Sequence, residues 1–321
     1  MHECYGFAVD CRADESAAAV VRRFFGPDRS DRGAGSRLRV GIEVRDRGGP
    51  APTTPRYFPA GWELADPVVI DLGRSAAEVS PAAGTIRIGL HPADLADPIV
   101  WGRWLLEKSF LITALRSERH YGLHAGAVTL SGLPVLVAAD SGVGKSTFVA
   151  WALRHGAGFT GDDAMIRHLG ETPGGFWGYP RAAYLSPDTI AGWPELAGAA
   201  TAPVPGRDKT RVEWPPALAG RLSSRVRPAA MLFLTRDHHE IRRLDAGQAA
   251  DRCREDYTAG KTGAGGRRRL EEDVLAQFAG LRLVEFGLTA DLDRNLANLA
   301  ELLAAVGRAP APLLDHARRG R

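Results

Sequence analysis

The alternation of apolar and polar positions changes several times along the chain, and each change predicts a different element. Strict alternation, as at residues 38–44, predicts a half-buried strand. Residues 98–117 carry apolar side chains with a helical period over about five turns. Strands are expected at 5–9, 38–44, 68–72 and 85–90, and helices at 15–25 and 98–117. Residues 1–115 are therefore predicted to form a mixed α+β module.

A second pattern begins after this module and consists of a strand, a glycine loop and a helix. The apolar run at 135–139 has the length of a buried strand, and Gly142 and Gly144 interrupt it. A helix is expected to begin near Lys145 and to end before Gly156, which is placed as a C-cap. In this order the backbone N–H groups of the loop and the helix N-terminus face one anion, so the stretch is a candidate phosphate site.

The loop approaches the phosphate-loop pattern of Gly, four residues and Gly-Lys-Ser/Thr. Gly144, Lys145 and Ser146 match it, whereas Ala139 replaces the first glycine. We expect Lys145 to reach the β- and γ-phosphates of a nucleoside triphosphate and Ser146 to ligate Mg²⁺. The predicted nucleotide-binding residues are Asp140, Ser141, Gly142, Val143, Gly144, Lys145, Ser146 and Thr147. The alternative is a glycine-rich turn that only resembles this loop.

Two adjacent carboxylates, Asp162 and Asp163, follow the next predicted strand at 158–161. Such a pair suits a site that needs both a magnesium ligand and a base, but side chains alternate in a strand, so only a bend would direct both to one metal. A solvated acidic turn is the alternative. Asp237, after the buried run 229–235, is a rival metal ligand.

Basic residues outside the loop offer further contacts. His124 lies in a predicted strand at 121–130, one hairpin before the loop, where a structural role is the simpler interpretation. Lys209, Arg211 and Lys261 are candidate contacts to phosphate or substrate, although a surface position would also explain either lysine. Among 41 basic residues the lysines are Lys108, Lys145, Lys209 and Lys261, so each stands out in an arginine-rich chain.

Composition narrows the class of protein. A length of 321 residues with 45% hydrophobic content allows a large core in one domain or two. A net charge of +3 does not indicate a nucleic-acid partner, and three cysteines without metal-ligand spacing indicate neither disulfides nor zinc. There is no signal-peptide core and no run of ~18 apolar residues. We therefore expect a cytoplasmic protein that does not bind membranes.

The spacing of these motifs resembles the catalytic domain of HPr kinase/phosphorylase and its relatives. That family has a histidine at a strand end, a GxSGxGKS-type loop, a helix that ends in glycine and an Asp-Asp pair. The matching residues here are His124, the run from Ala139 to Ser146, Gly156, Asp162 and Asp163. The resemblance implies an α/β fold with a P-loop kinase core of the HPr kinase and phosphoenolpyruvate carboxykinase type. This core would occupy residues 116–306, between the module at 1–115 and a flexible tail at 307–321.

The resemblance also implies an activity, which is transfer of the γ-phosphoryl group of ATP, with Mg²⁺, to a serine hydroxyl. Asp162 would be the base, His124 would position or protonate the phosphate side, and Lys145 would balance its charge. Ser146 and Asp163 would hold Mg²⁺, and the sequence leaves the division of roles between the two aspartates open.

The identity of the acceptor is less closely defined. Residues 175–181 lack the family's second, glutamate-containing signature. The pattern is closer to divergent members, including kinases of lasso-peptide precursors, so we expect a small protein or ribosomally made peptide as the acceptor. The alternatives are a nucleotide-binding regulatory module without catalysis, and a small-molecule kinase or carboxykinase-like enzyme. A homo-oligomer is one option for the assembly.

Overall fold

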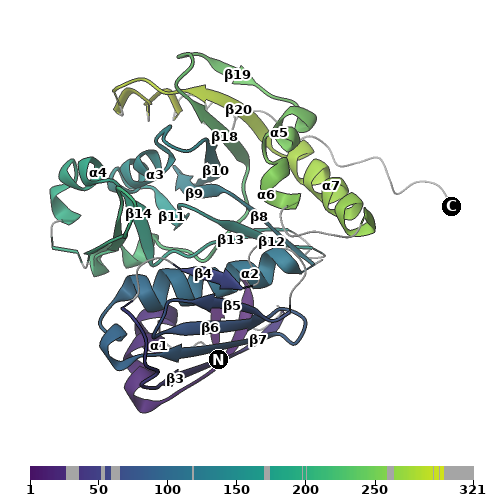
Figure 1. Cartoon of the computed structure of the whole chain (residues 1–321). Coiled ribbons are helices and arrows are strands. Elements are labelled where there is room, and N and C mark those ends of the chain that lie inside the picture. The colour runs from purple at the N-terminus through teal and green to yellow at the C-terminus, as the bar shows by residue number, and fades with distance from the viewer. Residues whose placement is uncertain are drawn as a thin grey trace.

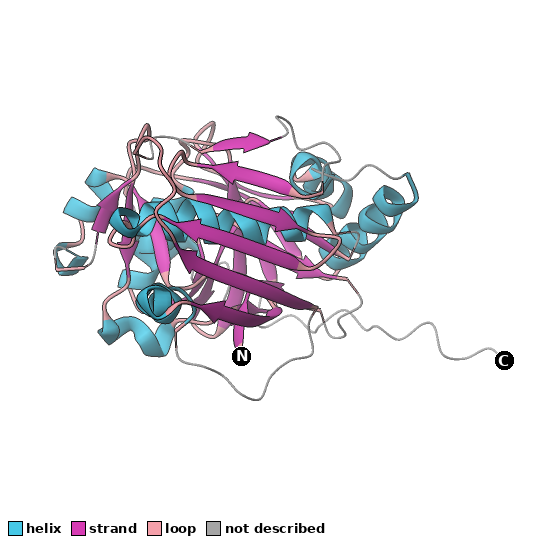
Figure 2. Ribbon diagram, turned by 60° about the horizontal axis from the view of Figure 1, so that its bottom comes forward, coloured by secondary structure: helices cyan, strands magenta, loops and turns pink. Residues whose placement is uncertain are grey.

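A computed structural model shows a mixed α/β protein with four sheets among its described residues (Figure 1). The described residues are 1–26, 36–51, 55–58, 66–117, 119–169, 174–196, 198–199, 201–258, 264–291, 293–295 and 297–299. Lys261 and the predicted tail at 307–321 lie outside them. Figure 2 shows helices on both sides of the strands. Within the described ranges, no helix combines the length and the apolar character needed to cross a membrane.

The first ninety or so residues build a seven-stranded sheet in the order β1-β2-β3-β7-β6-β5-β4. Its strands are β1 (His2–Cys4), β2 (Phe7–Ala13), β3 (Arg37–Val44), β4 (Arg56–Phe58), β5 (Val68–Asp71), β6 (Ala76–Ser80) and β7 (Thr85–Leu90). The alternation in β3 is confirmed, because Leu38, Val40 and Ile42 are buried and the residues between them are not. Strands β2, β3 and β7 are parallel, and helix α1 (Ala18–Phe25) follows η1 (Glu15–Ala17) between β2 and β3.

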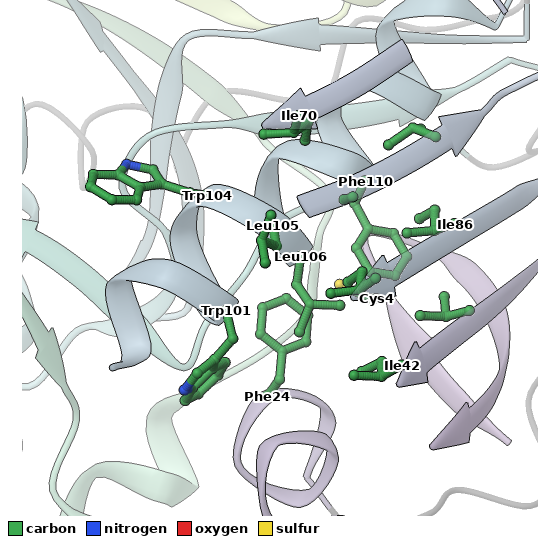
Figure 3. Packing of buried hydrophobic residues seen from close by; sticks show 14 of the residues in the cluster. Cys4, Phe24, Ile42, Ile70, Ile86, Trp101, Trp104, Leu105, Leu106 and Phe110 are labelled. Carbon is green, nitrogen blue, oxygen red and sulfur yellow. The ribbon is translucent and has the colours of Figure 1, made fainter. Parts of the chain in front are cut away.

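The helix predicted at 98–117 is confirmed in two parts, the π-helical segment η3 (Ile99–Glu107) and helix α2 (Lys108–Arg116). Every residue of η3 is buried. Trp101, Trp104 and Phe110 belong to one buried cluster that also contains residues of α1 and the seven-stranded sheet, so both tryptophans are core residues (Figure 3). Helix α2 contacts both β6 and β8 and thus lies between this sheet and the rest of the chain (Figure 1).

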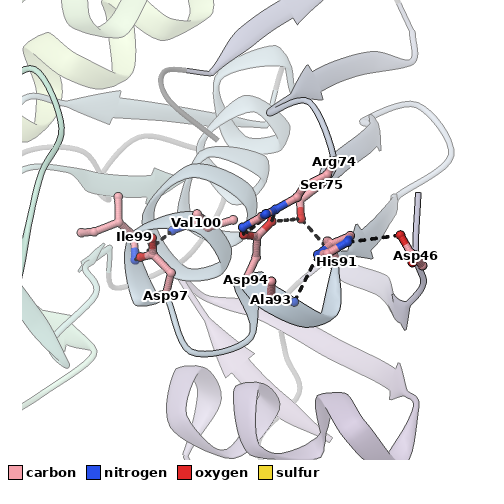
Figure 4. A network of polar contacts seen from close by, with 9 residues as sticks. All are labelled: Asp46, Arg74, Ser75, His91, Ala93, Asp94, Asp97, Ile99 and Val100. Carbon is pink, nitrogen blue, oxygen red and sulfur yellow. Dashed lines mark hydrogen bonds and ion pairs between the residues drawn. The ribbon is translucent and has the colours of Figure 1, made fainter. Parts of the chain in front are cut away.

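A polar network fixes the chain where it passes from the sheet to η3 (Figure 4). Arg74 and Ser75 both donate hydrogen bonds to the buried carboxylate of Asp94, at the end of η2 (Pro92–Asp94). Asp97 accepts the backbone N–H of Ile99 at 2.8 Å, which satisfies one of the free donors at the start of the helix. The network sets the direction in which η3 and α2 leave the sheet.

The glycine loop belongs to a six-stranded sheet with the order β11-β9-β10-β18-β20-β19. Its strands are β9 (Ala125–Leu130), β10 (Leu133–Ala139), β11 (Gly158–Gly161), β18 (Ala230–Thr235), β19 (Ile241–Arg243) and β20 (Arg282–Gly287). Helix α3 (Lys145–Arg154) covers one face, and α5 (Ala246–Arg252), α6 (Arg254–Thr258) and α7 (Ala264–Ala279) lie on the other (Figure 1). Val135 and Val137 face the α3 side, whereas Leu136 faces the α5–α7 side. Burial on both faces explains the continuous apolar run of β10.

Two smaller sheets complete the described fold. One has the order β17-β13-β12-β8, with β8 (His120–Leu123), β12 (Met165–His168), β13 (Phe176–Trp177) and β17 (Arg225–Val226). The other has the order β14-β16-β15, with β14 (Ala182–Leu185), β15 (Thr201–Pro203) and β16 (Thr210–Glu213). The short helices are α4 (Pro187–Ala191), η4 (Pro194–Leu196) and η5 (Pro216–Arg221). The single strand predicted at 121–130 is wrong in one respect. It is divided at His124, where the chain leaves β8 for β9 in a different sheet.

Candidate active site

The glycine loop, residues 140–144, joins the end of β10 to the start of α3. Gly142 and Gly144 have positive φ angles of 86° and 118°, which favour glycine because side chains with a Cβ are strained there. Ala139 instead continues β10 and pairs with Leu234 of β18, so the strand does not need a glycine at this position. The geometry explains why glycine is needed at positions 142 and 144 and why alanine is accommodated at position 139.

Arg236 closes this loop from the neighbouring strand. It follows β18, which runs parallel to β10, and its Nε donates to the carbonyl oxygen of Val143 at 2.9 Å. Asp237, the rival metal ligand, is exposed, and its backbone N–H is held by the hydroxyl of Thr235. Sequence reasoning missed Arg236. The available signal was its position, since the carboxyl ends of parallel strands meet at one edge of a sheet.

Lys145, the first residue of α3, is buried, with an exposed fraction of 7%. Its Nζ donates a hydrogen bond to the carbonyl oxygen of His124 at 3.1 Å. Burial lowers the pKa of Lys145 to about 8, although the nearby carboxylates of Asp163 and Asp162 oppose this shift. The structure therefore brings Lys145, His124 and the two aspartates together.

Asp163 is a partly exposed carboxylate that lies beside His124 and Arg103. Its Oδ1 lies 3.2 Å from Nε2 of His124, and its Oδ2 lies 3.9 Å from a guanidinium nitrogen of Arg103. Burial raises the pKa of Asp163, but the hydrogen bond from His124 and the charges of Arg103 and Lys145 outweigh it and hold that pKa well below its usual range. Asp163 is thus an anion throughout the physiological pH range.

Asp162 has the opposite electrostatic environment. Its side chain is buried, and its Oδ2 accepts the backbone N–H of Tyr184 at 3.0 Å. Burial and the charge of Asp163 raise the pKa of Asp162 to about 6, against the effects of the Tyr184 hydrogen bond and Lys145. The two neighbours in sequence therefore titrate far apart, a pattern typical of acid–base sites.

Buried polar side chains surround Tyr184, which contacts Asp162. The hydroxyl of Tyr184 donates to Glu107 at 2.7 Å, and the guanidinium carbon of Arg103 lies 3.7 Å from the centre of the Tyr184 ring. Burial raises the pKa of Glu107. One residue, Tyr184, thus contacts Asp162 through its backbone, Glu107 through its hydroxyl and Arg103 through its ring. Sequence reasoning did not find Tyr184, Arg103 or Glu107 as site residues.

Of the remaining candidate residues, Lys209 lies close to the start of α3, whereas Thr147 and Arg211 contact other residues. The Nζ of Lys209 lies 3.4 Å from the hydroxyl of Ser146, so Lys209 reaches the start of α3. Thr147 is engaged elsewhere, because its hydroxyl lies 2.7 Å from that of Thr189. The structure places Arg211 apart from the loop. It is buried at 2% exposure, forms an ion pair with Glu213 and stacks on the ring of Trp101.

The oxygen atoms near the glycine loop fit a magnesium ion that takes only one or two ligands from the protein. Among the described residues, no group of three or more His, Cys, Asp or Glu side chains could hold a metal ion. Mg²⁺ commonly takes one or two protein carboxylates and completes its shell with water and phosphate oxygens. Burial and, after it, the charge of Asp163 raise the pKa of Asp162, and a cation beside the two carboxylates would relieve their repulsion. Ser146 and Asp163 could supply such ligands.

Two adjacent hollows lie beside the carboxylates. A narrow cavity of about 10 Å³ is lined by Asp162, Asp163 and Tyr184, and it has room for about one water-sized group. A larger groove of about 360 Å³ lies beside it, lined by residues of α2, β8, β12 and α6. We call it the α2–α6 groove. The two hollows share Arg103, Lys108, Leu111, Asp163 and Ala164. A molecule in the groove could therefore present one small group to Asp162.

No protein-family model and no curated protein matches the chain. Among solved structures, the chain is similar to the Hpr(Ser) kinase/phosphatase from Coxiella burnetii, with a TM-score of 0.32 and 12% sequence identity. The similar region covers 58% of this chain and 90% of that one. A TM-score at this level does not establish a shared fold.

Proposed function

We propose that the chain is an ATP- and Mg²⁺-dependent kinase that transfers the γ-phosphoryl group to a serine hydroxyl of a small protein or peptide. We also propose that its core is of the P-loop kinase type, as the resemblance of its motifs implies. The observation that carries this proposal is the cluster of Lys145, Asp162 and Asp163 next to the glycine loop. The loop offers an anion site, and Lys145 at its end lies close enough to Asp162 and Asp163 for their charges to influence its pKa, so a cation and a candidate base lie near that site.

The electrostatics favour Asp162 as the base. A general base works best when its pKa lies near the working pH, and burial gives Asp162 a pKa of about 6. Asp163 is a much weaker base because its partners hold its pKa low. Asp163 is better suited to remain charged, to keep His124 oriented and to hold Mg²⁺ together with Ser146.

The proposed reaction is a direct displacement. The serine oxygen forms a bond to the γ-phosphorus, its proton passes to Asp162, and the bond from that phosphorus to the bridging oxygen of ADP breaks. Lys145 and the N–H groups of the glycine loop stabilise the negative charge on the phosphate. Bound Mg²⁺ supplies charge neutralisation at the phosphates, and Lys209 lies close enough to Ser146 to contact the same group.

The test combines calorimetry with mass spectrometry. The purified chain is titrated with ATP and Mg²⁺, and it is then incubated with both and a mixture of serine-containing peptides. We expect nucleotide binding and peptides that gain one phosphate. Binding without any phosphorylated product would favour a regulatory module instead. Phosphorylation of metabolites but of no peptide would favour a small-molecule kinase.

A further inference from the structure

Lys108 is the one lysine in the described ranges that the proposed chemistry does not use. It is the first residue of α2 and lines both the α2–α6 groove and the narrow cavity at Asp162. Among the described residues, no hydrogen bond or ion pair engages its ammonium group. Burial and the charge of Arg103 lower the pKa of Lys108. The charges of Asp163 and Glu107 oppose this shift, but neither carboxylate forms a hydrogen bond or ion pair with the ammonium group. A ligand anion at this partly desolvated cation would therefore be stabilised.

Arg207 supplies a second cation on the same groove. It is exposed in the turn between β15 and β16, and this hairpin also carries Lys209 toward Ser146. Arg103 contributes less, since it is already engaged by Asp163 and by the ring of Tyr184. The cations available to a ligand are therefore Lys108 and Arg207.

The acidic residues of the groove are less available. Asp163 also lines the groove, but its carboxylate is already paired with His124 and Arg103. Asp256 accepts the backbone N–H of His124 at 2.9 Å, so its carboxylate already has a partner. Glu255 is exposed, and water solvates it well. A ligand cation would gain little by replacing that water, whereas a ligand carboxylate would relieve the partly desolvated ammonium of Lys108. The balance of charge favours an acidic ligand.

The wall of the groove is apolar. Leu111 and Leu115 come from α2, Leu123 from β8 and Ile166 from β12. These side chains lie in the same hollow as Lys108, so one ligand can fill an apolar site and an anion site together. A peptide segment has both kinds of side chain within a few residues.

We propose that Lys108 and Arg207 form a carboxylate subsite of the α2–α6 groove, and that the acceptor is an acidic peptide segment. An apolar side chain of this segment would pack on Leu111 and Leu123. The hydroxyl of the accepting serine in the same segment would enter the narrow cavity at Asp162. This inference rests on the proposed function, because it names the acceptor of the same reaction. The inference requires that the peptide carry an acidic residue close in sequence to the accepting serine.

Two fluorescent peptides of equal length provide the probes. One contains Leu-Ser-Glu-Glu and the other contains Leu-Ser-Gln-Gln. Their binding is measured by fluorescence anisotropy with a non-hydrolysable ATP analogue and Mg²⁺ present. We expect the acidic probe to bind about tenfold more tightly, as is typical of one charge-assisted hydrogen bond. Equal affinities, or no binding of either probe at millimolar concentration, would overturn the subsite.

Variants assign the preference to particular residues. Lys108→Gln should remove most of the tenfold preference, and Arg207→Gln, at an exposed position, should reduce it. Arg12→Gln is the control, since it makes the same charge change at an exposed position of β2 that does not line the groove. An undiminished preference in folded Lys108→Gln and in Arg207→Gln would contradict the proposal. Arg207→Gln and the wild-type comparison remain decisive if Lys108→Gln does not fold.

Phosphoryl transfer is measured on the same probes and separates the two proposals. Transfer to both probes at equal rates, with equal affinities, would contradict the subsite and leave the kinase proposal intact. A preference for binding the acidic probe without transfer to any acceptor would contradict the kinase proposal and leave the subsite.

Discussion

The ammonium group of Lys145 donates a hydrogen bond of 3.1 Å to the backbone carbonyl of His124, which connects the glycine loop to the point where the chain changes sheets. The bond holds a buried cation at the end of the glycine loop, close to the two aspartates. It also fixes the backbone of the residue whose imidazole contacts Asp163. The glycine loop is therefore linked, through Lys145 and His124, to Asp163.

The first prediction concerns this lysine. Lys145→Met keeps the length of the side chain and removes its charge. We expect phosphoryl transfer to fall by about 10²–10³-fold or more, in line with the loss of one preorganised donor to the reacting group. Stability should not fall much, because burial already disfavours the charged form of Lys145. Initial rates and thermal unfolding of the same samples check both parts, and strong destabilisation with retained activity would contradict them.

The second prediction is the pH dependence of kcat/KM, which reports the free protein. The rate should rise as Asp162 loses its proton, through a pKa of about 6. It should fall as Lys145 loses its proton, through a pKa of about 8. In Asp162→Asn, any residual activity should lack the acidic limb. A profile that is flat from pH 5 to pH 9 in the wild-type protein would be incompatible with these assignments.

A third prediction uses stability, so it does not depend on knowing the substrate. Folding raises the pKa of Asp162 from an ordinary 3.8 to about 6, so the native state binds this proton more tightly than the unfolded chain. The contribution of Asp162 to stability is therefore favourable below pH 4 and is lost as pH rises through 6. Between pH 4 and neutral pH the free energy of unfolding should fall by on the order of 3 kcal/mol because of Asp162, and Asp162→Asn should abolish this fall.

The pKa of Asp163 shifts in the opposite direction on folding, so Asp163 serves as the comparison for Asp162. Its pKa is lowered on folding, so its contribution is present above the ordinary carboxyl pKa and disappears as the solution becomes more acidic. Asp163→Asn should therefore lower stability at neutral pH, while Asp162→Asn should not. Urea unfolding of both variants at pH 4.5 and pH 7 tests this. Equal pH dependence in the two variants would show that the electrostatic assignment is incorrect.

The fourth prediction compares two neighbours at the end of β18. Arg236→Gln removes the hydrogen bond to the carbonyl oxygen of Val143 and should loosen the glycine loop. We expect nucleotide affinity to fall by about tenfold, as is typical when one charge-assisted hydrogen bond is lost. Asp237→Asn is the matched control and should leave affinity unchanged. A larger loss in Asp237→Asn than in Arg236→Gln would restore Asp237 as a metal ligand.

Much of the local structure could be predicted from sequence, since local patterns determine it. The alternation in β3, the apolar run of β10 and the glycine loop each follow from the spacing of a few residues. The grouping of His124, Lys145, Asp162 and Asp163 was suggested only by the resemblance of their motifs to those of HPr kinase/phosphorylase. It could not be obtained from periodicity, because the four residues come from three different segments.

The parts that were missed depend on tertiary packing. Residues 121–130 have one unbroken pattern, so nothing in it marks His124 as the point where two sheets separate. Arg103 and Glu107 look like the polar residues of an ordinary helix, yet they are buried because β14 packs against η3. Tyr184 contacts Asp162 through its backbone, and a backbone contact leaves no signal in residue type.

The central claim is that the γ-phosphoryl group of ATP reaches a hydroxyl acceptor through Lys145 and Asp162. The most direct measurement follows label from [γ-³²P]ATP into a serine-containing peptide, for the wild-type protein, Lys145→Met and Asp162→Asn at pH 7.5. We predict labelled phosphoserine with the wild-type protein and none above background with either variant, while both variants keep the wild-type far-UV spectrum. Equal labelling by the wild-type protein and both folded variants, or ATP binding without labelling of any acceptor, would contradict the claim.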